Sequence, residues 1–125
     1  MGNYQTRRTI SPPRCPVEAL LQLLTGPWTI HILWVLQQRG PLRFGALRRA
    51  VGHVSAKVLT QRLRLLEKEG LIYRDYVPTI PPQVTYGLTA RGEELGEVVE
   101  GLEAVARRWR AAEGEAGSGT GLAAE

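Results

Sequence analysis

Residues 78–82 are Pro-Thr-Ile-Pro-Pro, a stretch that fits neither a helix nor the centre of a sheet, because proline fixes φ and has no N–H to donate. The flanking segments 71–77 and 83–88 are rich in β-forming side chains, and they predict two antiparallel strands joined by this tip. Elsewhere, apolar residues recur every three or four positions, as is typical of helices. The expected fold class is mostly α with one small β-hairpin (α+β).

The helical pattern is divided by glycine and proline into separate helices. Gly-Pro pairs at 26–27 and 40–41 end two helices, and the first of these is expected to begin around Pro16. A short third helix is predicted over 43–51. Ser55 then supplies the capping side chain of a fourth helix.

Three parts of the chain differ in composition. Residues 1–13 are polar and interrupted by proline, and they predict an extended arm. Residues 14–112 carry every regular pattern and predict one domain, in which Gly70 ends the fourth helix and Thr89 caps the last one. Residues 113–125 are rich in glycine and other small residues and predict a disordered tail.

Positive charge is concentrated in the middle of the chain. Residues 39–74 contain nine basic and two acidic residues, a net charge of +7. Residues 93–125 contain eight glutamates and three arginines, a net charge of −5. A basic centre indicates a surface that faces a polyanion. Charge alone leaves open the alternative of a solvated basic helix face.

Several classes of function lack the residues they need. Cys15 is the single cysteine, which excludes an intrachain disulfide and a Cys-x-x-Cys metal site. His31 and His53 have no carboxylate neighbour, and neither is beside Cys15 to serve as the base of a thiol enzyme. No transmembrane run or secretory signal is present. We therefore expect no catalytic residues, cofactor, metal or membrane contact, and a cytoplasmic location.

Two predicted helices joined by a short turn, 43–51 and 56–69, form an arrangement in which the second can enter a major groove. Hydroxyl and amide side chains can bind base edges, and lysine and arginine can hold phosphate or guanine. Arg62 lies on the flank of the helix and could instead pack its stem on the preceding helix. The candidate DNA contacts are Ser55, Lys57, Thr60, Gln61, Arg62 and Arg64, with Arg74 at the base of the hairpin.

A set of segments within residues 14–110 occurs in a characteristic order. They are Cys15-Pro-Val-Glu, Gly26-Pro-Trp-Thr-Ile-His-Ile-Leu, Arg43-Phe-Gly-Ala-Leu-Arg-Arg, Ser55-Ala-Lys-Val-Leu-Thr-Gln-Arg-Leu-Arg-Leu-Leu-Glu, Glu69-Gly-Leu-Ile and Pro81-Pro-Gln-Val-Thr-Tyr-Gly-Leu-Thr, followed by Gly92. Together they resemble the HxlR-type winged-helix transcriptional regulators of bacteria and archaea.

The resemblance implies a winged helix-turn-helix whose first and last helices build a homodimer on partly palindromic operator DNA. It also implies that the hairpin, or wing, approaches the flanking minor groove. The sequence departs from the family pattern at the wing tip, which carries no charge, so Arg74 is expected to hold the phosphate there. Other departures are Pro27 for lysine, His31 for an apolar residue, Ala56 for proline and Gln83 for a basic residue.

Cys15 is a candidate redox sensor. It follows Arg14 at a predicted helix N-terminus, and both features favour the reactive thiolate. By resemblance, some regulators of this type sense oxidants or electrophiles through a cysteine at this place, so an oxidant or small molecule is an expected signal. The alternative is a small, partly buried structural residue.

These observations predict a sequence-specific transcriptional regulator that binds double-stranded DNA as a homodimer. A different class, a winged-helix module that docks a partner protein without specific DNA binding, is the alternative. That module would present an acidic or apolar helix face, and the face made by Lys57, Gln61 and Arg64 argues against it. The tryptophans 28, 34 and 109 are expected in the core or the dimer interface rather than in a ligand pocket.

Overall fold

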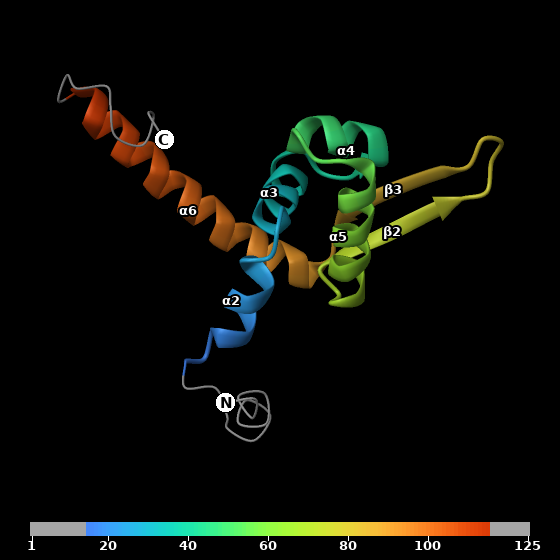
Figure 1. Ribbon diagram of the computed structural model, residues 1–125, viewed down its shortest axis with the longest axis horizontal. Helices are drawn as coiled ribbons and strands as arrows, with labels where there is room; N and C mark the ends of the chain where they lie inside the picture. Colours follow the sequence, from blue (N-terminus) through green and yellow to red (C-terminus); the bar gives the residue numbers. More distant parts are fainter. Residues whose placement is uncertain (1–14, 116–125) are drawn as a thin grey trace.

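The structure, a computed structural model, describes residues 15–115, so the predicted arm at 1–13 and residues 116–125 of the predicted tail lie outside the described residues. The predicted mostly α fold with a small hairpin is confirmed (Figure 1). The helices are α2 (Glu18–Leu24), α3 (Thr29–Arg39), α4 (Phe44–Val51), α5 (Ala56–Lys68) and α6 (Ala90–Glu115), and the strands are β1 (Leu42–Arg43), β2 (Ile72–Val77) and β3 (Gln83–Leu88).

The sheet has three antiparallel strands in the order β1-β3-β2. The predicted hairpin pairs β2 with β3 from Ile72 opposite Leu88 to Val77 opposite Gln83. The third strand, β1, was not predicted, because the sequence pattern placed Arg43 at the start of a helix. This strand has only two residues, and it forms because Pro41 ends the preceding helix beside the free edge of β3.

The core lies where α3, α4 and α5 meet the sheet. Ile32, Leu33 and Leu36 of α3 are buried together with Leu47 of α4. On α5 the leucines at helical spacing, Leu59, Leu63 and Leu66, are 0–1% exposed, whereas Ala56 in the first turn is exposed. The helix α3 therefore holds the other helices and the sheet around one cluster of apolar side chains.

The predicted helix ends are confirmed by specific hydrogen bonds. Ser55 Oγ accepts a bond of 3.1 Å from the backbone N–H of Val58. Gly70 follows α5 with a φ of +78°, a left-handed conformation that costs glycine little. The hydroxyl of Thr89 accepts from the N–H of Gly92 at 3.0 Å and donates to the carbonyl of Gly70 at 2.6 Å. Thr89 thus joins the end of α5 to the start of α6.

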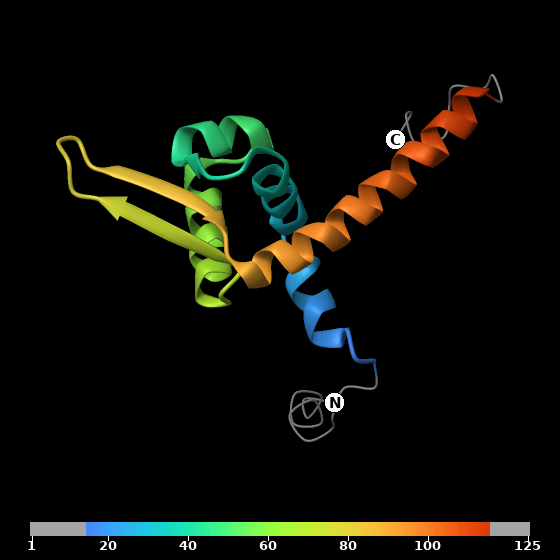
Figure 2. The same cartoon turned by 180° about the vertical axis from the view of Figure 1, so that it is seen from behind.

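The helix α2 differs from its prediction in start and in packing. It begins at Glu18, so Pro16 precedes the helix instead of lying in its first turn. None of its residues is buried, and Leu20 and Leu21 are 39% and 50% exposed. Only Leu23 and Leu24 reach the core. Figure 2 shows the cause, since α2 projects away from the other helices that the structure describes.

The helix α6 also projects from the body and ends later than expected. It continues to Glu115, whereas the disordered tail was predicted to begin at 113. The residues that precede this point include arginine, alanine and glutamate, which favour helix strongly enough to carry it past Gly114. Figures 1 and 2 both show its carboxyl-terminal half extending beyond α3, away from the other helices and the sheet.

Within residues 15–115, no single helix is long and apolar enough to cross a membrane. The helices α2 and α3 meet the length and hydropathy criteria only when they are taken together, and they join at a bend of 84°.

Candidate nucleic-acid interface

The helices α4 and α5 form a fixed pair. Leu47 of α4 and Leu59 of α5 belong to the same buried cluster. The turn between the helices is held by Arg48, whose Nε donates a hydrogen bond of 2.9 Å to the carbonyl of Val54. Gly52 has a φ of +119°, which favours glycine and lets the chain reverse here. The orientation of α5 therefore follows from α4 and the core.

The outer face of α5 gathers most of the predicted contacts. Lys57, Gln61 and Arg64 are exposed and lie at spacings of four and three residues, opposite the buried leucines. Ser55 is exposed at the start of the helix, and Thr60 is half-buried beside Gln61. The helix thus presents a row of two cations and one amide to the solvent, with hydroxyl groups next to it.

Arg62 lies apart from this row. Its side chain is partly buried, and Nη2 donates a hydrogen bond of 2.8 Å to the hydroxyl of Thr29, which is 0% exposed. The Nε of Arg62 is buried and has no hydrogen-bond partner among the residues that the structure describes. Its guanidinium also lies so close to Gly26 that a side chain there would collide with it. This geometry corresponds to a packing role for Arg62, with the contact made to α3 instead of the preceding helix α4.

Arg74 is exposed on β2, in the wing. Its guanidinium carbon lies 5.6 Å from the centre of the Tyr76 ring, a distance at which the cation and the ring attract each other. The ring therefore restrains a positive charge on the strand that leads to the wing tip.

A second basic group, which the sequence analysis did not select, lies beside the start of α5. Arg48, Arg49 and His53 line a hollow of about 520 Å³ together with Ser55. Backbone N–H groups at helix starts and arginine side chains are common phosphate contacts. The signal was present in the sequence as the Arg48-Arg49 pair, but the segment was interpreted mainly through its apolar core residues.

Exposed apolar side chains gather on α6, away from the basic face. Val98, Leu102 and Trp109 are 51%, 54% and 60% exposed. Between α6 and α3 lies a hollow of about 380 Å³, lined by Ile30, His31, Trp34, Val99, Leu102 and Glu103. The indole Nε1 of Trp34 is buried without a hydrogen-bond partner within residues 15–115. Of the other predicted core tryptophans, Trp28 packs against the core.

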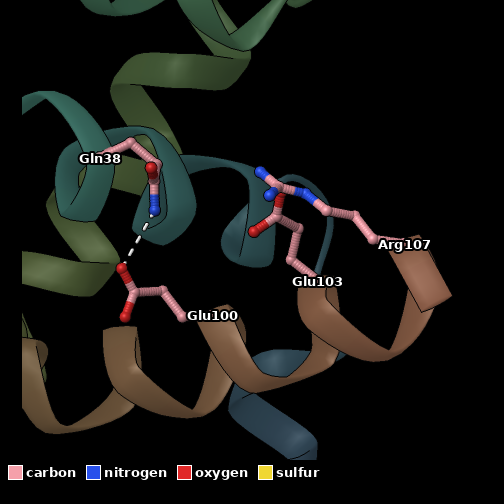
Figure 3. A network of polar contacts seen from close by, with 4 residues as sticks. All are labelled: Gln38, Glu100, Glu103 and Arg107. Carbon is pink, nitrogen blue, oxygen red and sulfur yellow. Dashed lines mark hydrogen bonds and ion pairs between the residues drawn. The ribbon is translucent and has the colours of Figure 1, made fainter.

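Polar contacts hold this part of α6 in place. Gln38 Nε2 on α3 donates a hydrogen bond of 3.1 Å to Glu100 Oε2 on α6 (Figure 3). One turn further, Glu103 and Arg107 form an ion pair within α6. The apolar hollow is therefore bordered by a polar bridge between the two helices.

Cys15 lies outside α2, three residues before its first residue, rather than at the helix terminus that the sequence predicted. Its thiol is free and exposed, and its carbonyl accepts a hydrogen bond of 3.0 Å from the N–H of Glu18. Among the described residues, no three histidine, cysteine, aspartate or glutamate side chains gather closely enough to hold a metal ion.

Comparison with known proteins connects this geometry to a family. A family model described as HxlR-like helix-turn-helix matches residues 23–114. The HTH-type transcriptional regulator sll1512 of Synechocystis is 42% identical over 95 residues, which cover 76% of this chain and 70% of that protein.

Two solved structures are also similar. A protein described as a MarR-family transcriptional regulator of Porphyromonas gingivalis W83 has a TM-score of 0.71 and 33% identity, covering 78% of this chain and 94% of that one. The redox regulator HypR in its oxidised form has a TM-score of 0.69 and 31% identity, covering 75% and 96%.

Proposed function

The chain belongs to the HxlR-like helix-turn-helix family of transcriptional regulators, and on this premise we propose that it binds a specific, partly palindromic DNA operator as a homodimer. The observation that carries the proposal is the outer face of α5. Lys57, Gln61 and Arg64 stand exposed in one row on a helix whose opposite face is locked into the core. A row of this kind can enter a major groove as one rigid unit.

Each side chain of the row has a distinct task in this proposal. The amide of Gln61 can pair with an adenine through two hydrogen bonds and so read sequence. Lys57 and Arg64 can hold phosphate or guanine, and Thr60 can contact a thymine methyl group. Arg48 and Arg49 neutralise phosphates beside the start of α5, where His53 and Ser55 also lie, and Arg74 does so from the wing.

The proposed dimer uses the two projecting helices. Leu20 and Leu21 on α2 and Val98, Leu102 and Trp109 on α6 expose apolar surface within one protomer. Large exposed apolar side chains of this kind, gathered on two projecting helices, mark an interaction site. The hollow that contains Trp34 continues the same surface toward α3. We infer that a second copy of the chain covers this surface.

A dimer with a twofold axis presents two α5 helices in opposite directions. Its operator would then contain two inverted half-sites about 34–36 Å apart, or a multiple of that distance. A regulator of this kind has no catalytic step, and it acts where the chromosome lies, so we propose a cytoplasmic location.

We also propose that Cys15 responds to oxidants. The similar protein HypR is described as a redox regulator, and the Cys15 thiol is exposed next to α2. An oxidant such as diamide can take two electrons and two protons from two Cys15 thiols, one per protomer, and leave one intersubunit disulfide. The bond requires the two Cα atoms to lie within about 7 Å of each other.

Selection of bound duplexes from a random pool tests the proposal. We expect the selected sequences to contain an inverted repeat. We also expect the affinity for them to fall steeply as the salt concentration rises, because the release of condensed counterions from the DNA then gains less entropy. Light scattering should give the mass of a dimer, and Leu102→Glu on the apolar face should give a monomer. Ala104→Glu, at an exposed position on another face of α6, is the matched control and should stay dimeric. A monomeric wild type or salt-independent binding would contradict the proposal.

A further inference from the structure

The wing tip, residues 78–82, is the most exposed apolar feature of the described chain. The side chain of Ile80 is 99% exposed, a value that no other large apolar residue within 15–115 approaches. The whole tip is exposed and contains no charged residue. A fully exposed isoleucine has no structural task in the protomer, because it touches neither the core nor the sheet.

The tip nevertheless has a defined shape. Thr79 donates its N–H to the carbonyl of Val77 at 2.8 Å, and its hydroxyl donates to the carbonyl of Pro81 at 2.8 Å. Pro78, Pro81 and Pro82 restrict three of the five tip residues to a narrow range of φ. Ile80 is therefore held on a tight loop that loses little conformational entropy when it binds a partner.

The wing carries this loop away from the body. Beyond Thr85, where β1 ends its pairing, β2 and β3 continue as a two-stranded ribbon to Val77 and Gln83. Figures 1 and 2 show the ribbon projecting past α4 and α5, on the opposite side of the molecule from the free end of α6. The tip is thus remote from the proposed dimer surface and extends from the part of the protein that contains α5.

The tip has no cation that could pair with a phosphate. With no lysine or arginine, residues 78–82 cannot release counterions from DNA. Proteins that bind the minor groove often insert isoleucine, leucine or proline between base steps instead. Arg74, further back on β2, supplies the positive charge that would hold the flanking backbone.

Building on the proposed function, we propose that the wing tip is an apolar wedge that places Ile80 in the minor groove of duplex DNA beside each half-site. There it packs on sugars and base edges and partly unstacks a step that deforms easily, such as TA or CA. The contact adds affinity that does not depend on salt, in contrast to the contacts of Arg74 and the α5 row. It also makes the operator preference extend beyond the bases that α5 reaches.

Titration of the full chain onto the selected operator at two salt concentrations tests the wedge. Ile80→Ala should weaken binding roughly tenfold, as expected for leaving one apolar side chain uncovered, and by the same factor at both concentrations. Ile80→Leu keeps the apolar volume and should bind within about twofold of wild type. Arg74→Ala is the electrostatic control. It should reduce the slope of log affinity against log salt concentration by about one.

A second measurement reports on the DNA directly. The fluorescence of 2-aminopurine, placed in turn at steps flanking the half-site, should rise at one step when wild type binds and should not rise with Ile80→Ala. If wild type binds the operator but Ile80→Ala matches it in affinity and fluorescence, the proposed minor-groove contact is wrong. A partner protein is then the alternative ligand of the tip. If wild type binds no duplex at low salt, the proposed function fails together with the wedge.

Discussion

Arg62 of α5 donates a hydrogen bond of 2.8 Å to the hydroxyl of Thr29, a residue that is 0% exposed at the start of α3. The bond ties α5 to the central helix of the core. Two residues further along α5, Arg64 is exposed on the proposed DNA-binding face. Arg62 therefore joins α5 to α3, whereas Arg64 is the one of these two arginines that we propose binds DNA.

Removal of Arg62 should lower stability and leave DNA binding nearly intact. Arg62→Ala deprives the buried Thr29 hydroxyl of its partner and should lower the free energy of unfolding by about 1–3 kcal/mol. Arg64→Ala is the matched control and should change stability by less than about 0.5 kcal/mol while weakening all duplexes. Urea denaturation and duplex titration of both variants measure these effects. The opposite result, with Arg62→Ala stable but weak on DNA, would restore Arg62 as a phosphate contact.

Gln61→Ala should change the sequence that the protein prefers. The amide is expected to read one adenine, so its loss should cost about 1–3 kcal/mol on the operator and much less on random duplex. Repeating the selection with this variant should show relaxed preference at one position of each half-site. An equal loss on operator and random DNA would exclude base readout by Gln61.

Ser55 should contribute to both stability and binding, and two substitutions separate the contributions. Ser55→Ala removes the acceptor for the Val58 N–H and should lower the free energy of unfolding by about 1 kcal/mol. Ser55→Asp keeps a capping oxygen and should retain stability, but its negative charge should weaken binding to phosphate. Thermal denaturation and duplex titration of the pair test this. If Ser55→Asp binds duplex DNA with wild-type affinity, the start of α5 does not contact the DNA backbone.

Gly92 should tolerate no side chain. A Cβ atom at this position would collide with the carbonyl oxygen of Leu71, which is a backbone atom and cannot rotate away. Gly92→Ala should therefore destabilise the fold by about 1–3 kcal/mol. Gly101→Ala, in the same helix with nothing within 4 Å of the added Cβ in the protomer, should instead stabilise it by up to about 1 kcal/mol. Equal unfolding midpoints for the two variants would refute the close approach of α6 to Leu71.

Diamide should cross-link the wild-type protein and leave Cys15→Ser unchanged. A band of dimer mass on a non-reducing gel should appear only for wild type and should disappear with a thiol reductant. Because Cys15 adjoins the projecting helix α2, the cross-link should also change operator affinity. If both proteins show the same gel band and the same operator affinity before and after diamide, Cys15 has a structural role. Another part of the protein then receives the signal.

The sequence alone determined the features that depend on neighbouring residues. The leucine spacing of α5 specified its buried face, Ser55 and Thr89 specified two helix starts, and Pro78–Pro82 specified the hairpin tip. These predictions succeed because capping, proline geometry and helical periodicity are local effects that need no knowledge of the rest of the chain.

Only the tertiary structure decided the features that depend on which elements meet. Arg62 lies on the flank of α5, where a long side chain can turn toward solvent or toward a neighbour, and the buried Thr29 of α3 decided its direction. The pair Leu42–Arg43 became a strand because β3 offered a free edge. Leu20 and Leu21 of α2 stayed exposed because α2 projects away from the other helices within residues 15–115. Whether a partner is present, and which one, depends on residues far away in sequence, about which the local pattern carries no information.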